Sequence, residues 1–220
     1  GQTDRPLQSY DVELWADDLA ALLDKLDIPR AHVMGTSAGG MIALKFAAKY
    51  PEKCIGVVSD CAFAKCDEMR KIMFRTWRHM ARSWGCSTEF ADHVLTQAVG
   101  ADYLDGPNGP AIVEMVRTIV GLNSVDTVVQ ACLAMENMDL REDCKKIKNP
   151  TLVITAKKDM LTPMETGASG AGAQWVADNV PGCELIVYED IGHADLVECP
   201  EKTIASTIDF LHRAKQKVLG

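Results

Sequence analysis

The 220-residue sequence contains no run of 18 apolar residues, so it lacks the pattern expected of a membrane-spanning helix. Its cysteines form no C-x-x-C pair and show no zinc-type spacing, and no cluster of histidine, aspartate and glutamate indicates a metal site. Positive charge is also scarce, because 23 Lys and Arg stand against 31 Asp and Glu, a formal charge of -8. We therefore expect no nucleic acid, membrane, metal or cofactor as a partner.

What the sequence does contain is the composition of an ordinary globular chain, with 47% hydrophobic and 25% charged residues. This length supports one substantial core, with or without an inserted lobe. We interpret the eight cysteines as small apolar residues or reduced thiols, which favours a reducing, cytoplasmic location; a disulfide framework is the less favoured alternative. They are Cys54, Cys61, Cys66, Cys86, Cys132, Cys144, Cys183 and Cys199.

The most informative stretch is G-T-S-A-G at residues 35–39, where an apolar run stops and an alanine-rich helical pattern begins. This is the layout of a nucleophile elbow, a strained strand-to-helix turn that exposes a serine and needs small neighbours. Ser37 is therefore a candidate nucleophile, and the Ala38 amide a candidate oxyanion donor. The motif alone is weak, because chance produces it in about one chain in ten or twenty of this length. An ordinary serine in a glycine-rich connection is the alternative.

The hydrophobic pattern predicts an α/β fold with a mostly parallel sheet and helices on both faces. Residues 61–148 show only helical spacing, which predicts an all-helical cap inserted between two strands. The core then consists of residues 1–60 and 149–220. Strands are predicted at 31–34, 54–60, 151–155 and 183–189, and helices at 11–26, 38–50, 89–99, 110–122, 125–138, 165–179 and 204–217.

One predicted cap helix carries an apolar stripe on one face and three arginines on the other. We expect the stripe to face the core or the substrate, since the two roles overlap in a cap. The arginines are expected on a solvated face, with a carboxylate clamp as the less favoured reading. The stripe is Met69, Met73, Trp77, Met80 and Trp84, and the arginines are Arg75, Arg78 and Arg82.

Titratable residues follow two of the predicted strands. Asp159 comes after the third strand and His193 after the fourth. In a parallel sheet these ends lie together with the elbow, so Ser37, Asp159 and His193 can form a catalytic triad in the chain order expected for it. Asp60, at the end of the second strand, is a rival acid. The remaining histidines, expected to be structural, are His32, His79, His93 and His212.

The three motifs together resemble those of α/β-hydrolases in the serine esterase and lactonase group. The matching stretches are GTSAGGMIALKFAAKYPEK, NPTLVITAKKDMLTP and EDIGHADLVECPEK. Among subfamilies, the chain is similar to 3-oxoadipate enol-lactonases. The resemblance implies hydrolysis of a small-molecule ester or lactone through an acyl-enzyme on Ser37. Carbon-carbon bond hydrolases, acyltransferases and hydrolase-like hormone receptors share the motifs and stay open as alternatives.

The sequence departs from the family pattern at its beginning. Family members carry several strands ahead of the residues that match the loop at Gly1, and a loop there donates the second oxyanion amide. We therefore expect this chain to be the carboxyl-terminal portion of a longer protein, completed by a missing segment or a companion chain. Without it, the first strand would be an open sheet edge, and association into a homo-oligomer is an alternative.

Overall fold

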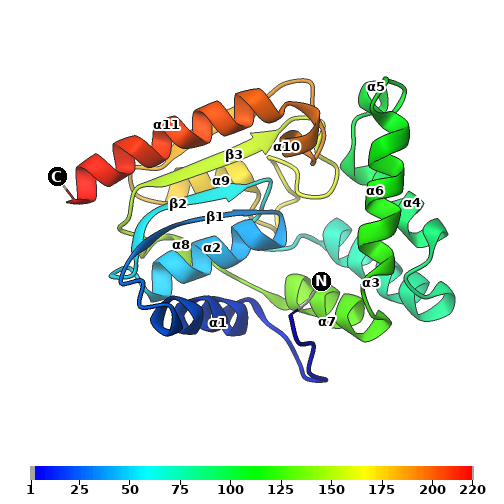
Figure 1. Cartoon of the computed structure of the whole chain (residues 1–220), viewed down its shortest axis with the longest axis horizontal. Coiled ribbons are helices and arrows are strands. Elements are labelled where there is room, and N and C mark those ends of the chain that lie inside the picture. Colours follow the sequence, from blue (N-terminus) through cyan, green and yellow to red (C-terminus); the bar gives the residue numbers. More distant parts are fainter. Residues whose placement is uncertain (1–2, 220) are drawn as a thin grey trace.

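In the computed structural model, which describes residues 3–219, a four-stranded parallel sheet lies between helices on both faces (Figure 1). The strand order β1-β2-β3-β4 follows the chain, and the strand arrowheads point toward a group of helices at one end of the molecule. The α/β class and the parallel sheet are as predicted. The strands are β1 (Ala31–Thr36), β2 (Cys54–Asp60), β3 (Thr151–Ala156) and β4 (Glu184–Tyr188).

Both faces of the sheet are covered, because alternate residues of the central strands join two different cores. Val57 and Val153 pack with one set of helices, whereas Val58 and Ile154 pack on the opposite face. Such two-sided burial explains why β2 and β3 consist almost wholly of apolar and small residues. The first face carries α1 (Val12–Lys25), α2 (Ala38–Lys49), α8 (Arg141–Cys144) and α9 (Ala173–Asn179), and the second carries α11 (Pro200–Leu219), preceded by α10 (Asp195–Glu198).

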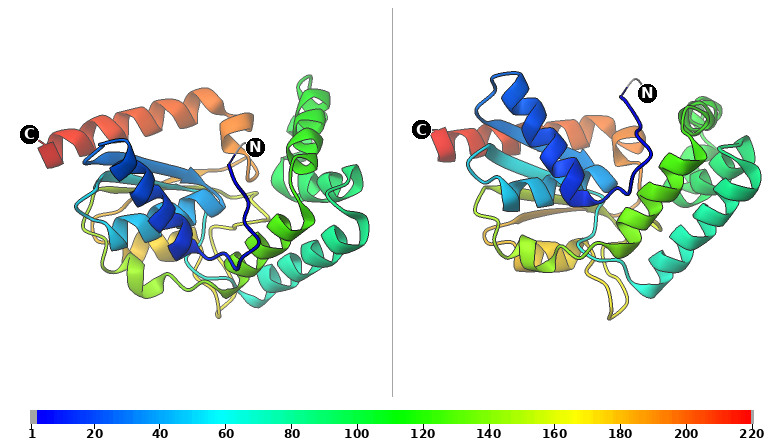
Figure 2. Two further views of the ribbon diagram at one scale, coloured as in Figure 1. Left: turned by 60° about the horizontal axis from the view of Figure 1, so that its bottom comes forward. Right: turned by 90° about the horizontal axis from the view of Figure 1, so that it is seen from below.

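Helices also fill most of the chain between β2 and β3, and we call α3–α7 the cap helices. They stand beside the carboxyl ends of the strands (Figure 2). α8 also falls within residues 61–148, but it packs against α2 and α9. The cap helices are α3 (Glu68–Trp84), α4 (Thr88–Ala98), α5 (Ala101–Leu104), α6 (Gly109–Gly121) and α7 (Val125–Asn137).

Within residues 3–219, no single helix is both long and apolar enough to cross a lipid bilayer. α6 and α7 reach that length and apolar character only when taken together, and the chain bends by 98° between them.

The helix predicted at 165–179 forms only from Ala173 onward. The preceding segment is a loop whose backbone binds elsewhere: the Gly167 amide donates to Asp67 Oδ2 at 2.9 Å, and Ala171 forms a bridge with Lys65. Glycine favours such a path, since a Cβ at Gly172 would lie 2.5 Å from the Met164 carbonyl oxygen. The long-range contacts of this segment therefore outweigh its helical pattern.

The apolar stripe on α3 is buried only in its middle turns. Met73 and Trp77 are half-buried and pack against the core, but Met69 is 66% and Trp84 56% exposed. The expectation that the whole stripe faces the core or substrate is thus wrong at both ends, where Met69 and Trp84 face solvent.

The three arginines of α3 do not share one environment. Arg75 and Arg82 are exposed, as predicted for a solvated face. Arg78 is instead half-buried, and its Nη2 lies 2.6 Å from Glu136 Oε2 on α7. The solvated-face prediction is therefore wrong for Arg78, because α7 packs beside α3 and supplies a carboxylate there.

Candidate active site

Ser37 lies at the junction between β1 and α2, in a backbone conformation with φ 59° and ψ -123°. Non-glycine residues rarely adopt this region, so the surrounding structure must hold it. One constraint is the Ser37 amide, which donates to the Asp60 carbonyl at 2.8 Å. Another is the tight approach of Gly35, where a Cβ would lie 2.2 Å from the Gly39 backbone. The local geometry is that of the nucleophile elbow.

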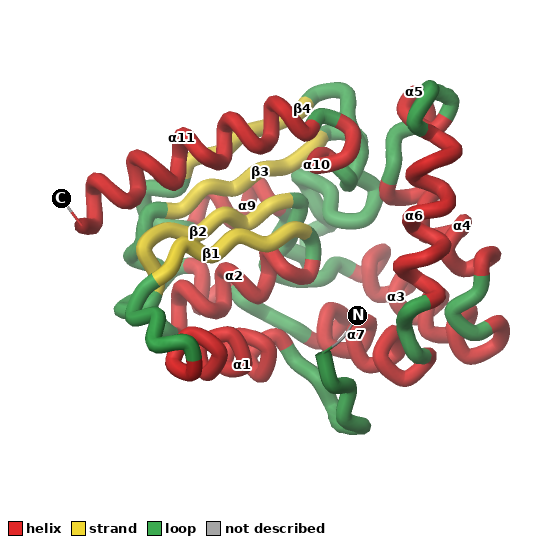
Figure 3. The backbone as a smooth tube through the Cα atoms, viewed as in Figure 1, coloured by secondary structure: helices red, strands yellow, loops and turns green. Residues whose placement is uncertain are grey.

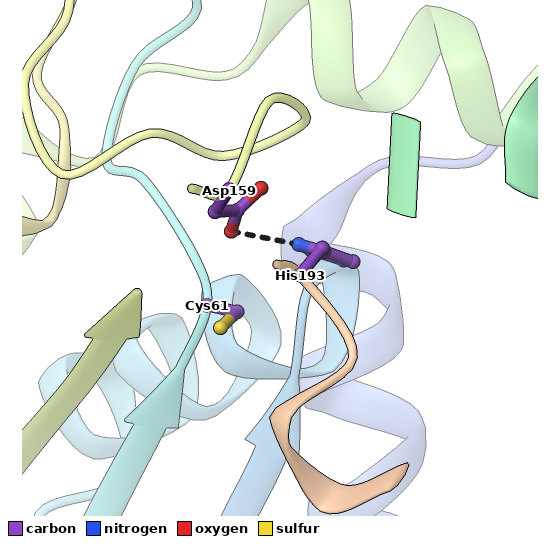
Figure 4. Close-up of side chains that lie close together, drawn as sticks. All are labelled: Cys61, Asp159 and His193. Carbon is purple, nitrogen blue, oxygen red and sulfur yellow. Dashed lines mark hydrogen bonds and ion pairs between the residues drawn. The ribbon is translucent and has the colours of Figure 1, made fainter. Parts of the chain in front are cut away.

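His193 and Asp159 lie together beyond the ends of β4 and β3. Figure 4 shows the imidazole pointing toward the carboxylate, with His193 Nδ1 2.9 Å from Asp159 Oδ2. Both side chains are buried. The other Asp159 oxygen accepts the amides of Leu161 and Thr162, each at 2.8 Å. The loop after β3 therefore holds the carboxylate in one orientation.

This hydrogen bond fixes the imidazole tautomer if Asp159 is ionised. Burial opposes ionisation of Asp159, but hydrogen bonds from His193 and Thr162 outweigh it and hold the pKa below its usual value. A carboxylate can only accept, so the shared hydrogen belongs to Nδ1. Nε2 is then left as the proton acceptor, which is the form that a general base needs.

Thr162 is a site residue that the sequence analysis missed. Its hydroxyl lies 2.6 Å from Asp159 Oδ2, 3.0 Å from His193 Nδ1 and 2.6 Å from the Cys61 carbonyl oxygen. It therefore links the acid–imidazole pair to the end of β2. The available signal was its position three residues after Asp159, where a hydroxyl and an amide can both return to an aspartate side chain.

Ser37 and Thr162 line the same cavity, of about 290 Å³, between the sheet and the cap helices. No hydrogen bond within residues 3–219 joins the Ser37 hydroxyl to His193, whereas the pair of His193 with Asp159 is fully formed. Contacts of catalytic groups are often loose without substrate. Ala38 is the first residue of α2, so its amide lies in the turn whose N–H groups lack partners within the helix.

The sequence was compared with models of known protein families. The model of the alpha/beta hydrolase fold matches residues 1–200, in agreement with the fold and the elbow. The chain belongs to this family. A protein of Caulobacter sp. (strain K31) that carries the provisional name carbamate hydrolase RutD is 29% identical, over 92% of this chain and 73% of its own length. 3-Oxoadipate enol-lactonase 2 of Acinetobacter baylyi is 28% identical, over 91% and 71%. The crystal structure of the enol-lactonase from Burkholderia xenovorans LB400 superposes with a TM-score of 0.86 at 25% identity, covering 96% of this chain and 77% of that one.

Within this α/β-hydrolase, Asp60 is not bonded to the imidazole. Its Oδ2 accepts a hydrogen bond from Thr36 Oγ1 at 2.7 Å, and its carboxyl oxygens approach those of Asp195, with one pair within 4.8 Å. Asp195 Oδ2 accepts from Thr203 at 3.0 Å, and Oδ1 of both acids has no hydrogen-bond partner among the described groups. Protonation of one carboxyl group relieves the repulsion between the two.

The electrostatics of this acid pair favour the protonated form. Both acids are buried. Burial raises the pKa of Asp60 to about 7, and the neighbouring charge of Asp195 adds to the increase. Burial also raises the pKa of Asp195. Two buried carboxyl groups this close disfavour ionisation of both at once.

Cys61, the residue after Asp60, has its thiol close to the Asp159–His193 pair and to the Asp60–Asp195 pair. Among the described residues, Cys61 belongs to two clusters of potential metal-ligand atoms. One contains Asp159 and His193 and the other Asp60 and Asp195, and the atoms of each cluster lie within 4.8 Å of one another. The sequence spacing did not indicate these two clusters, because their members come from three segments that are far apart in the sequence. Burial raises the pKa of the Cys61 thiol well above its usual value, so the thiol form is favoured.

The loop that carries His193 is fastened to the cap helices. Glu198 Oε1 accepts the amides of Gly100 at 3.2 Å and Gly192 at 3.1 Å, and the Ala194 amide donates to the Ala98 carbonyl at 3.1 Å. The position of His193 is therefore coupled to the loop between α4 and α5.

None of His32, His79, His93 and His212 lines the cavity beside Ser37.

Proposed function

We propose that this protein is a serine hydrolase that cleaves a carboxylic ester or lactone of a small molecule. The observation that carries the proposal is the buried pair of His193 and Asp159, whose geometry leaves Nε2 as the proton acceptor; Thr162, which contacts both, lines the same cavity as the elbow serine. The names of relatives point the same way, since they include an enol-lactonase and a methyl ester esterase.

In the proposed mechanism, His193 Nε2 takes the proton of Ser37 as the hydroxyl oxygen attacks the substrate carbonyl. Asp159 stabilises the imidazolium that forms. The Ala38 amide donates to the developing oxyanion, and such a donor typically contributes about 10²- to 10³-fold to the rate. As the intermediate collapses, the bond to the leaving oxygen breaks and the imidazolium gives its proton to that oxygen, which releases the alcohol and leaves an acyl group on Ser37. His193 then activates water, which releases the acid and restores the serine.

The proposal predicts that Ser37→Ala lowers kcat on a p-nitrophenyl ester by on the order of 10⁴- to 10⁶-fold, because the attacking oxygen is lost. Alanine removes only that oxygen, so the circular dichroism spectrum and the thermal midpoint are expected to stay near those of the parent. A fluorophosphonate probe should label Ser37 in the parent protein.

The matched control is Ser83→Ala, which removes an exposed hydroxyl on α3. It is expected to keep both the labelling and the hydrolysis of the ester. Full activity in Ser37→Ala, or labelling on another residue, would exclude Ser37 as the nucleophile.

A further inference from the structure

The cavity beside Ser37 extends from the elbow into the cap helices, and its walls are apolar and aromatic. The cap contributes Met73, Phe74, Trp77, Phe90, Val94 and Val128. Trp77 makes edge-to-face contacts with Phe74 at 5.7 Å and with Phe90 at 6.2 Å between ring centroids. These contacts hold the aromatic wall in place, so the cavity presents a preformed apolar surface to whatever occupies it.

None of the described residues that line this cavity carries a charge. Besides Ser37 and Thr162, its polar groups are those of Asn123, Thr127, the Cys132 thiol and the Trp77 indole. The hydroxyl of Thr127 is hydrogen-bonded to Ser124 at 2.8 Å, whereas Trp77 Nε1 has no hydrogen-bond partner among the described residues. The absence of a lining cation matters because an acyl group in this cavity would be removed from water.

The cationic groups close to the cavity already bind carboxylates or a carbonyl, although Nε of Arg70 and of Arg78 has no partner among the described residues. On α3, the buried Arg70 pairs with Asp67 at 3.3 Å and the half-buried Arg78 pairs with Glu136 at 2.6 Å. Arg5 lies in an adjoining cavity that shares only Asn123 and Thr127 with this one, and its Nη1 donates to the Leu122 carbonyl at 2.7 Å. A carboxylate held within the 290 Å³ cavity therefore meets no lining cation.

From this lining we infer that the substrate is an uncharged ester or lactone whose acyl part is apolar, and that acids with a second, ionised carboxyl group are rejected. The inference rests on the proposed function and specifies its substrate class. Each methylene group that moves from water into the cavity contributes favourable transfer free energy, whereas an ionised carboxylate loses its hydration without gaining a cationic partner. The cavity volume lies near the lower end of ligand sites, roughly 300–1,000 Å³, which fits a short acyl chain.

The direct test compares two esters of equal length, p-nitrophenyl hexanoate and the mono-p-nitrophenyl ester of adipic acid. The second carries a carboxylate in place of the terminal methyl group. We expect kcat/KM to be at least about 100-fold higher for the neutral ester, because the charged acyl chain must be desolvated without compensation. Equal rates, or a preference for the charged ester, would overturn the inference.

A charge placed in the wall should change this preference. Val94 lines the cavity from α4 and is only half-buried, so Val94→Lys can accommodate its ammonium group there. We expect this variant to reduce the preference for the neutral ester by at least about tenfold, since the lysine pairs with the adipate carboxylate. Val94→Met is the matched control: it adds a side chain of similar length without charge and should keep the ratio of the two esters, whatever it does to the individual rates.

A binding measurement separates this inference from the proposed chemistry. In the Ser37→Ala variant, hexanamide should quench or shift the fluorescence of Trp77, and adipic acid monoamide should bind at least about tenfold more weakly. Preferential binding of hexanamide with no serine-dependent hydrolysis of any ester would uphold the cavity inference and reject the proposed function. Serine-dependent hydrolysis with no discrimination between the two esters would do the reverse.

Discussion

At the scale of single residues, the buried carboxyl groups near the elbow are stabilised in opposite protonation states. Asp159 accepts hydrogen bonds at both oxygens, which lowers its pKa and favours the carboxylate. The ionised Asp159 stabilises the folded protein at pH values above the ordinary carboxyl pKa. This contribution is lost as the pH falls through the lower pKa that Asp159 has in the folded protein. Asp60 has few donors and an acidic neighbour, Asp195, so it favours the protonated form. Its contribution is present below the ordinary pKa and is lost as the pH rises through about 7.

The raised pKa of Asp60 predicts that Asp60→Asn changes how stability depends on pH. Between about pH 4 and 7 the folded protein holds more protons at this position than the unfolded chain, so the parent loses stability as the pH rises. Asparagine cannot ionise, and its amide can donate to Asp195. We expect the variant to be more stable than the parent at pH 8 by about 1–3 kcal/mol, with a smaller difference at pH 4. Urea unfolding at a series of pH values measures this.

The control for this prediction is Asp18→Asn, which changes an exposed carboxyl group on α1. It is expected to leave the pH dependence of the parent unchanged. If Asp60→Asn showed the same slope of unfolding free energy against pH as the parent, the protonated acid pair would be rejected.

The sequence indicated the residues at strand ends but not the contacts among loops. Ser37, Asp159 and His193 could be selected because each carries reactive chemistry immediately after a predicted strand. The catalytic roles of all three stay predictions. Asp195 could not be selected, and Thr162 only through its spacing from Asp159, since their importance depends on how the chain after β3 and β4 folds back on the site.

At the scale of secondary-structure elements, the cap helices are joined to the sheet through the first turn of α3. Asp67 is the N-cap of α3, accepts the Arg70 amide at 2.9 Å and is buried. It also accepts the Gly167 amide at 2.9 Å from the loop that follows β3. The same carboxylate thus begins a cap helix and fastens it to the segment that carries Asp159.

We predict that Asp67→Ala destabilises the protein more than the corresponding change at an exposed cap. Asp11 is the N-cap of α1, accepts the Leu14 amide at 2.7 Å and is exposed, so Asp11→Ala should cost about 1 kcal/mol. Asp67→Ala also leaves Arg70 and the Gly167 amide without their partner, for a total of about 2–4 kcal/mol. Urea unfolding of the two variants measures the difference. Equal losses would show that the loop contact contributes nothing.

Strands that are buried in the middle of the sheet were predicted well. Short helices and segments held by individual hydrogen bonds were not. The strands β2 and β3 are buried throughout and mostly apolar, and they could be placed to within a residue. The four-residue helices α5, α8 and α10 are too short to show a 3.6-residue period. The helix expected at 165–172 is absent because that segment pairs with Lys65 and Asp67 instead.

At the scale of the whole molecule, the sheet ends at β1. Among the described strands, β1 pairs only with β2, and its other edge is not covered by a strand (Figure 3). The strand is less buried than β2 and β3, and Met34 is 38% exposed. The expectation that a further segment or a companion chain adjoins this edge stays a prediction, as does the cytoplasmic location inferred from the cysteines.

An uncovered strand edge offers unpaired N–H and C=O groups to another strand, so the 220-residue chain by itself is predicted to associate through β1. Sedimentation velocity over a roughly 100-fold concentration range should show a rising mean sedimentation coefficient. Met34→Lys places a charge on the exposed face of the edge strand and should weaken association at least about tenfold, because pairing would bury that charge. Met34→Leu keeps the position apolar and should associate like the parent. A sedimentation coefficient that is independent of concentration, with no companion peptide by mass spectrometry, would show that this edge is stable when open and would remove the physical reason for expecting a strand beside it.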